Sequence, residues 1–107
     1  MSETLARIRT LIAAGDFRIS DHAYRQILER ELIIEQLVES ARHAEIVEDY
    51  PDFHKGPSVL ILSRTEGQAV HMVWGIPKNQ AGPAWLVTAY VPDRQEWMPD
   101  NKTRRRK

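Results

Sequence analysis

Three residues that suit chemistry on phosphate esters fall on the polar face of one predicted helix: His22, Arg25 and Arg30. A histidine can exchange a proton near neutral pH, and an arginine can hold two phosphate oxygens at once. The free amides at the start of a helix also favour an anion. The same pattern suits an ordinary solvated helix face, on which Arg25 pairs with Glu29 and His22 supports the helix cap.

The sequence lacks the motifs for nucleotide binding, metal binding and serine hydrolysis. The five glycines form neither a phosphate-binding loop nor a dinucleotide fingerprint. There is no cysteine, and no two of the four histidines are four residues apart on a helix, so no metal-ligand spacing is present. Ser58 and Ser63 lack the glycines of a nucleophile elbow. We therefore expect no metal ion, no cofactor and no serine hydrolase.

The elements that must position these residues change in character along the chain. Apolar residues with helical spacing predict helices over about 3–14, 20–30 and 34–44, with Ser20 as a cap. Residues 16–19 are interpreted as a connector. Short β-branched and aromatic runs then predict strands over about 45–50, 57–64, 69–75 and 84–92. Helices followed by sequential strands indicate an α+β domain with helices on one face of an antiparallel sheet.

Length and charge limit the remaining possibilities. A chain of 107 residues forms one domain, here 1–98, and the basic end is expected to be a mobile tail over 99–107. The tail sequence KTRRRK is interpreted as either a solubilising end or an arm that contacts phosphates. No membrane span or signal-peptide core is evident, so we expect a soluble, cytoplasmic protein with no membrane partner.

Several motifs in order resemble a known family. The runs ISDHAYRQILERELI, EIVEDY, AVHMVWG and VTAYVPDRQEW are similar to domain of unknown function family 4258, over about residues 18–97. Glu31 stands where that family usually has glycine. The family in turn resembles small RelE/ParE-type toxins, whose fold group includes ribonucleases. This resemblance implies N-terminal helices packed on a twisted four-stranded antiparallel sheet.

The resemblance also implies a site for metal-independent RNA cleavage. It places the family's site residues on His22, Arg25, Arg30, His71, Thr88 and Tyr90. Such a reaction needs a base, an acid and cations for the charged phosphorane. We expect catalytic roles for His22, Arg30, His71 and Tyr90, and phosphate-binding roles for Arg25 and Thr88.

Each of these residues also has a structural interpretation. Thr88 and Tyr90 alternate with apolar residues and so suit one face of a strand, and His71 suits a hydrogen-bonded strand histidine. The three tryptophans are expected in the core rather than as platforms for stacked bases. They are Trp74, Trp85 and Trp97.

Two functions therefore stay open. The first is a ribonuclease of a bacterial toxin–antitoxin system, with an antitoxin protein and RNA or the ribosome as partners. The second is a non-catalytic module of the same fold that holds a partner protein or peptide on its sheet. The zero net charge argues against a free nuclease, because it provides little attraction for RNA. Convergence of His22, Arg30, His71 and Tyr90 in one cleft would favour the ribonuclease.

Overall fold

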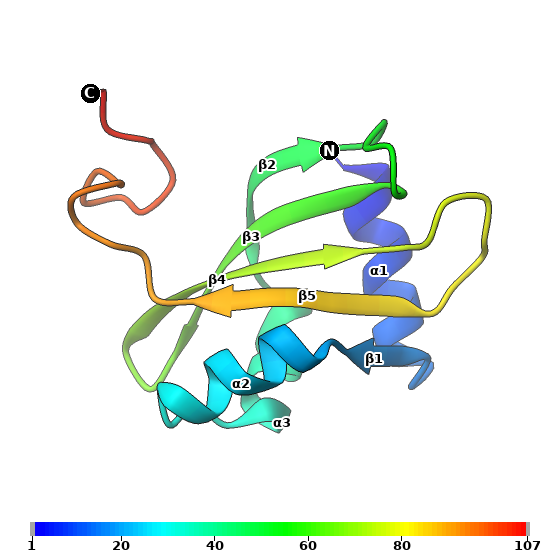
Figure 1. Cartoon of the computed structure of the whole chain (residues 1–107), viewed down its shortest axis with the longest axis horizontal. Coiled ribbons are helices and arrows are strands. Elements are labelled where there is room, and N and C mark those ends of the chain that lie inside the picture. Colours follow the sequence, from blue (N-terminus) through cyan, green and yellow to red (C-terminus); the bar gives the residue numbers. More distant parts are fainter. Residues whose placement is uncertain (1, 107) are drawn as a thin grey trace.

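A five-stranded sheet with three helices forms the domain (Figure 1). The computed structural model describes residues 2–106. In chain order the elements are α1 (Glu3–Ala13), β1 (Phe17–Ile19), α2 (Asp21–Glu29), α3 (Ile34–Ala41), β2 (Glu45–Tyr50), β3 (Ser58–Thr65), β4 (Gln68–Gly75) and β5 (Ala84–Tyr90). The strand order across the sheet is β1-β5-β4-β3-β2, and the helices lie N-terminal to most of the sheet. The α+β arrangement with N-terminal helices agrees with the sequence prediction.

Local signals explain why the first two helices begin where they do. The Ser2 hydroxyl accepts a hydrogen bond from the Leu5 amide at 3.0 Å, and the Ser20 hydroxyl accepts one from the Ala23 amide at 3.0 Å. Each bond satisfies an amide that has no partner within its helix. The third helix starts after Ile33 without a side-chain cap. Its uncapped start matches the absence of a capping residue in the sequence.

The predicted four-stranded antiparallel sheet is wrong, because the expected connector contains a fifth strand. β1 pairs with β5 in parallel, and the other three pairs are antiparallel. The Ala84 amide donates to the Asp16 carbonyl at 3.1 Å, and the Ser20 amide donates to the Leu86 carbonyl at 3.0 Å. A three-residue strand is too short to show an alternating pattern, and its partner lies far away in the sequence.

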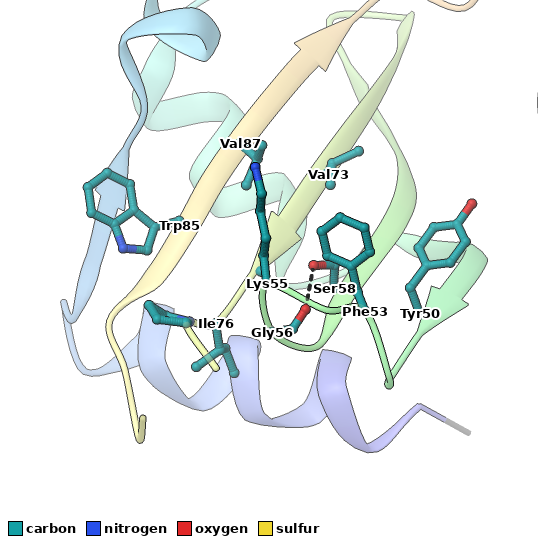
Figure 2. Close-up of a pocket in the computed structure, with 11 residues that line it drawn as sticks. Tyr50, Phe53, Lys55, Gly56, Ser58, Val73, Ile76, Trp85 and Val87 are labelled. Carbon is teal, nitrogen blue, oxygen red and sulfur yellow. Dashed lines mark hydrogen bonds between the residues drawn. The ribbon is translucent and has the colours of Figure 1, made fainter. Parts of the chain in front are cut away.

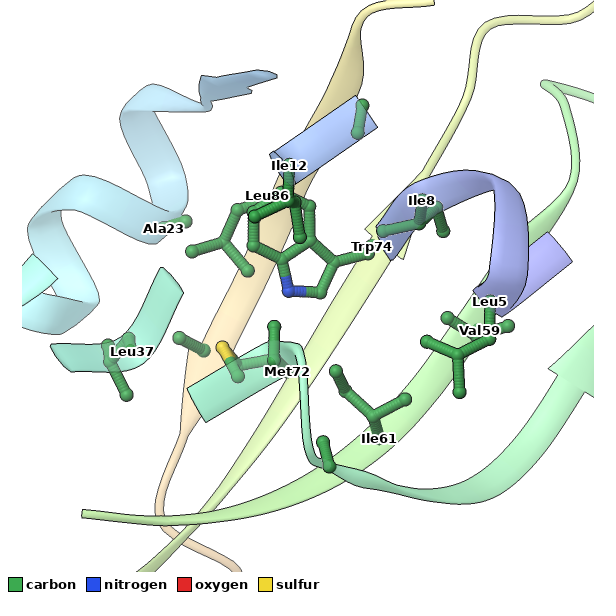
Figure 3. Packing of buried hydrophobic residues seen from close by; sticks show 14 of the residues in the cluster. Leu5, Ile8, Ile12, Ala23, Leu37, Val59, Ile61, Met72, Trp74 and Leu86 are labelled. Atoms are coloured by element: carbon green, nitrogen blue, oxygen red, sulfur yellow. The ribbon is translucent and has the colours of Figure 1, made fainter. Parts of the chain in front are cut away.

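One face of the sheet carries the core. Strand residues on this face pack against apolar side chains of all three helices (Figure 3). The strand contribution is Val59, Ile61, Val70, Met72, Trp74, Ala84, Leu86 and Ala89. The helix contribution includes Leu5, Ile8, Ile12, Ala23, Ile27, Leu37 and Ala41. Because successive side chains of a strand point to opposite faces, residues such as His71 and Val73 lie on the face without helices. We call this face the open face.

Candidate functional site

His71 lies at the centre of a polar cluster on the open face. Its Nδ1 atom is 3.1 Å from the Tyr90 hydroxyl, and its Nε2 atom is 2.6 Å from the Asn101 carbonyl oxygen. The carbonyl can only accept, so Nε2 carries the proton and Nδ1 accepts from Tyr90. The His71 ring also meets the Trp97 ring edge to face, with centroids 4.5 Å apart. The side chain is fully buried, and burial lowers the pKa of His71.

The chain after β5 covers this cluster. Residues 93–106 fold into what we call the C-terminal hairpin, in which the Met98 amide donates to the Thr103 carbonyl and the Arg105 amide to the Glu96 carbonyl. Asp100 closes its turn by accepting from the Lys102 and Thr103 amides. These bonds allow the hairpin to present the Trp97 ring to His71. The cluster is therefore closed to solvent by the protein's own chain.

Ion pairs connect this hairpin to β2. Arg104 donates to both carboxylate oxygens of Glu48 at 3.0 Å, and Lys102 donates to Glu45 at 2.9 Å. The Arg104 guanidinium lies 4.6 Å from the Trp97 ring centroid, and its bonds to Glu48 lower the pKa of that carboxyl. Two of the terminal cations are thus paired within the molecule. Mobility of residues 99–107 stays a prediction, and Lys107 lies outside the described residues.

The other candidate residues lie on or beside α2. His22, Arg25 and Arg30 are exposed, and none of the three forms a side-chain hydrogen bond or ion pair with another residue of the described range 2–106. The pairing of Arg25 with Glu29, which belonged to the alternative of an ordinary solvated helix face, is therefore not seen there. Thr88 does form a side-chain hydrogen bond. Its hydroxyl donates to the Gln26 side-chain oxygen at 2.6 Å, and the same oxygen accepts from the Ala89 amide at 2.8 Å.

These candidates do not meet in one cleft. α2 packs Ala23 and Ile27 into the core on the helix-covered face of the sheet, whereas His22, Arg25 and Arg30 are exposed. His71 and Tyr90 lie together on the open face beneath the C-terminal hairpin. The sheet thus separates the phosphate-holding candidates from the buried histidine. Sequence reasoning missed Gln26 and Glu48, because their partners are distant in the chain.

The uncovered half of the open face is an apolar groove of about 480 Å³. Its lining includes side chains of β4 and β5 together with aromatic rings from β2 and the following loop: Val73, Trp85, Val87, Tyr50 and Phe53 (Figure 2). Trp85 is 36% exposed and Val87 is 43% exposed. The prediction of a core position holds for Trp74 and Trp97, but it is wrong for Trp85.

Lys55 is the cationic side chain of this groove. In Figure 2 it extends in front of the sheet between Trp85 and Phe53. Ser58 adds a hydroxyl, which donates to the Gly56 carbonyl at 3.1 Å. The groove therefore offers broad aromatic and aliphatic contact with few polar atoms. Its chemistry suits binding of an apolar group, since none of its described lining residues is His, Asp or Glu.

Comparison with known proteins identifies the family. Residues 19–91 match the family model described as domain of unknown function (DUF4258). The chain belongs to this family. The matched range contains α2, α3 and β2 to β5 in full, but only the last residue of β1. It therefore includes most of the groove. Comparison with curated proteins finds no match, and comparison with solved structures finds none either.

Among residues 2–106, no group of three or more His, Asp or Glu side chains is arranged to hold a metal ion. None of the helices within that range is long and apolar enough to cross a membrane.

Proposed function

We propose that this DUF4258 domain is a binding module, which holds an apolar segment of a partner protein in the groove of its open face. The observation that carries the proposal is the set of exposed apolar side chains that line this groove, above all Trp85 and Val87. Exposed apolar patches on soluble domains mark interaction sites, and Trp and Tyr are enriched among the residues that dominate binding energy.

The shape of the groove favours a protein segment. It lies along strands β4 and β5 on the surface of the sheet, where an extended chain can follow it (Figure 2). Burying an apolar side chain of the partner there stabilises the complex by about 25 cal/mol for each Å² removed from water. The rigid sheet contributes by holding the lining residues in place before binding, which lowers the entropic cost.

Binding of short random peptides displayed on phage tests this proposal. We expect selected peptides to bind the wild-type protein and to bind Trp85→Ser at least about tenfold more weakly, because truncating a central aromatic residue costs about 2 kcal/mol or more. Leu28→Ser is the matched control: Leu28 is exposed on α2, outside the groove, so this variant should bind as the wild type does. Equal binding to all three proteins would overturn the proposal.

A ribonuclease of the toxin type is the second candidate, and the exposed, unpaired state of His22, Arg25 and Arg30 within residues 2–106 favours it. In that case His22→Ala or Arg30→Ala should slow cleavage of a mixed RNA pool by about 10² to 10⁴. An acidic antitoxin would be expected to cover Arg25 or Arg30. The assay contains excess chelator, since a metal-independent reaction should survive it. An inert wild-type protein would refute this candidate.

A further inference from the structure

Two loops close one end of the groove and hold each other in position. The loop 51–57 and the loop 76–80 are joined by backbone bonds from the Ile76 amide to the Pro57 carbonyl at 3.0 Å and from the Lys78 amide to the Lys55 carbonyl at 3.1 Å. Gly56 permits this approach: its φ is +129°, and a Cβ there would overlap the Ile76 carbonyl oxygen. The backbone therefore fixes Lys55 and Lys78 as neighbours.

A second hollow, of about 610 Å³, adjoins the groove at these loops. The two hollows share Phe53, Gly56 and Pro77, so both lie against the same loop pair. Half of the residues that line the second hollow are polar or charged, among them Arg7, Asp52, Lys78 and Gln80. A ligand that fills the groove and extends past these loops would thus meet polar and charged side chains.

The charges that line the two hollows are unbalanced. Three cations, Arg7, Lys55 and Lys78, face a single carboxylate, Asp52. None of the four forms an ion pair with another residue in the described range 2–106. The Arg7 guanidinium donates only to the backbone, to the Gln80 carbonyl at 3.3 Å. These cations therefore remain available to an anion on a ligand, which they would attract over a distance limited by ionic strength.

We infer that the partner segment carries an acidic side chain next to its apolar residues. Its apolar residues fill the groove beside Trp85, and its carboxylate lies between Lys55 and Lys78, within reach of Arg7. This inference rests on the proposed binding function and adds a chemical preference to it. The apolar contacts provide most of the affinity, whereas exposed ion pairs contribute modestly and select the sequence.

Peptides selected by phage display on the wild-type protein test this inference. We expect the enriched peptides to combine apolar residues with an adjacent Asp or Glu. Each of the best binders is then synthesised in two forms, one acidic and one in which Gln or Asn replaces the acidic residue. The acidic form should bind the wild-type protein about threefold to tenfold more tightly, as expected for one or two exposed ion pairs. Added salt should reduce this difference.

The double variant Lys55→Gln/Lys78→Gln should lose most of the preference for the acidic form and retain the affinity for the amide form. The matched control, Arg94→Gln/Arg106→Gln, removes two exposed cations from the C-terminal hairpin and should keep the preference for the acidic form. If enriched peptides lack acidic residues, or if both forms bind the wild type equally, the inference is overturned while the binding function stands. If Trp85→Ser binds every peptide as well as the wild type does, the proposed function itself fails.

Discussion

His71 is a residue whose burial outweighs its hydrogen bonding to Asn101 in setting the pH dependence of stability, because burial lowers its pKa and the hydrogen bond raises it. In the folded state its ring is buried between Tyr90 and Trp97, and burial lowers the pKa of the imidazole below its ordinary value. The Arg104 guanidinium, which covers Trp97, lowers it further. The unfolded chain then binds a proton at a higher pH than the folded chain does. Protonation of His71 therefore favours unfolding.

From this we expect the free energy of unfolding to fall as the pH is lowered from about 7.5 to about 5.5, and to fall less in His71→Gln. Glu48 contributes little in this range, because its lowered pKa places its titration at more acidic pH. Urea unfolding at both pH values measures the difference. His22→Gln, which removes an exposed histidine, is the matched control for the loss of a buried one. A slope in His71→Gln as steep as in the wild type would contradict the expectation.

At the scale of elements, β1 determines how α1 and α2 are attached to the sheet. This short strand lies between the two helices in the chain and hydrogen-bonds to β5 on its outer side. α2 is then fixed to β5 a second time, through the Gln26 side chain that accepts from Thr88 and Ala89. The backbone pairing of β1 and the side chain of Gln26 thus both attach the helices to β5.

Arg18→Pro should weaken this attachment. Arg18 pairs with Trp85 in the middle of β1, between the bonds made by Asp16 and Ser20. A proline there has no amide to donate, and an unpaired buried carbonyl costs about 1–3 kcal/mol of stability. Chemical denaturation provides the measurement, and Arg18→Ala, which keeps the amide, should change stability by less than about 0.5 kcal/mol. Equal effects of proline and alanine would show that this backbone pairing contributes little.

The elements with strong local patterns could be predicted from the sequence. All three helices and β2 to β5 lie close to their expected ranges, because each has a periodic apolar pattern or a clear cap. β1 and the exposure of Trp85 could not be predicted. The run AWLVTAYV is apolar on both of its faces, which is typical of a strand covered on both sides. Only the arrangement of the other elements reveals that the half of the open face beside Trp85 and Val87 has no cover.

Some features of the candidate site could likewise be predicted from the sequence, and others could not. The polar face of α2 follows from its spacing, and the structure exposes His22, Arg25 and Arg30 as that spacing predicts. The groove depends on side chains from β2, β4, β5 and two loops, which have no shared signal in the sequence. The separation of His71 from α2 depends on the register of β4, since a shift of one residue would place His71 on the other face.

At the scale of the whole molecule, the open face has two halves with different cover. The C-terminal hairpin packs Trp97, which is 3% exposed, over one half, while the groove leaves the other half free. We expect Trp97→Ala to lower the free energy of unfolding by about 3–5 kcal/mol, as loss of a buried aromatic residue does. Met98→Ala is the control: this neighbouring side chain is 39% exposed and should cost far less. Denaturant titration of both variants provides the test, and similar small losses would argue against a structural role for the hairpin.

The parallel pairing of β1 with β5 also has a consequence during synthesis of the chain on the ribosome. Residues 17–19 are synthesised well before their partners, residues 84–86, which follow after the rest of the sheet. Until β5 emerges, β1 has no sheet edge to join, and β4 presents an unpaired edge with apolar side chains on both faces. Such contacts between distant parts of a chain form slowly, and an unpaired apolar edge invites association with other chains. The growing chain should therefore depend on chaperones until β5 is in place.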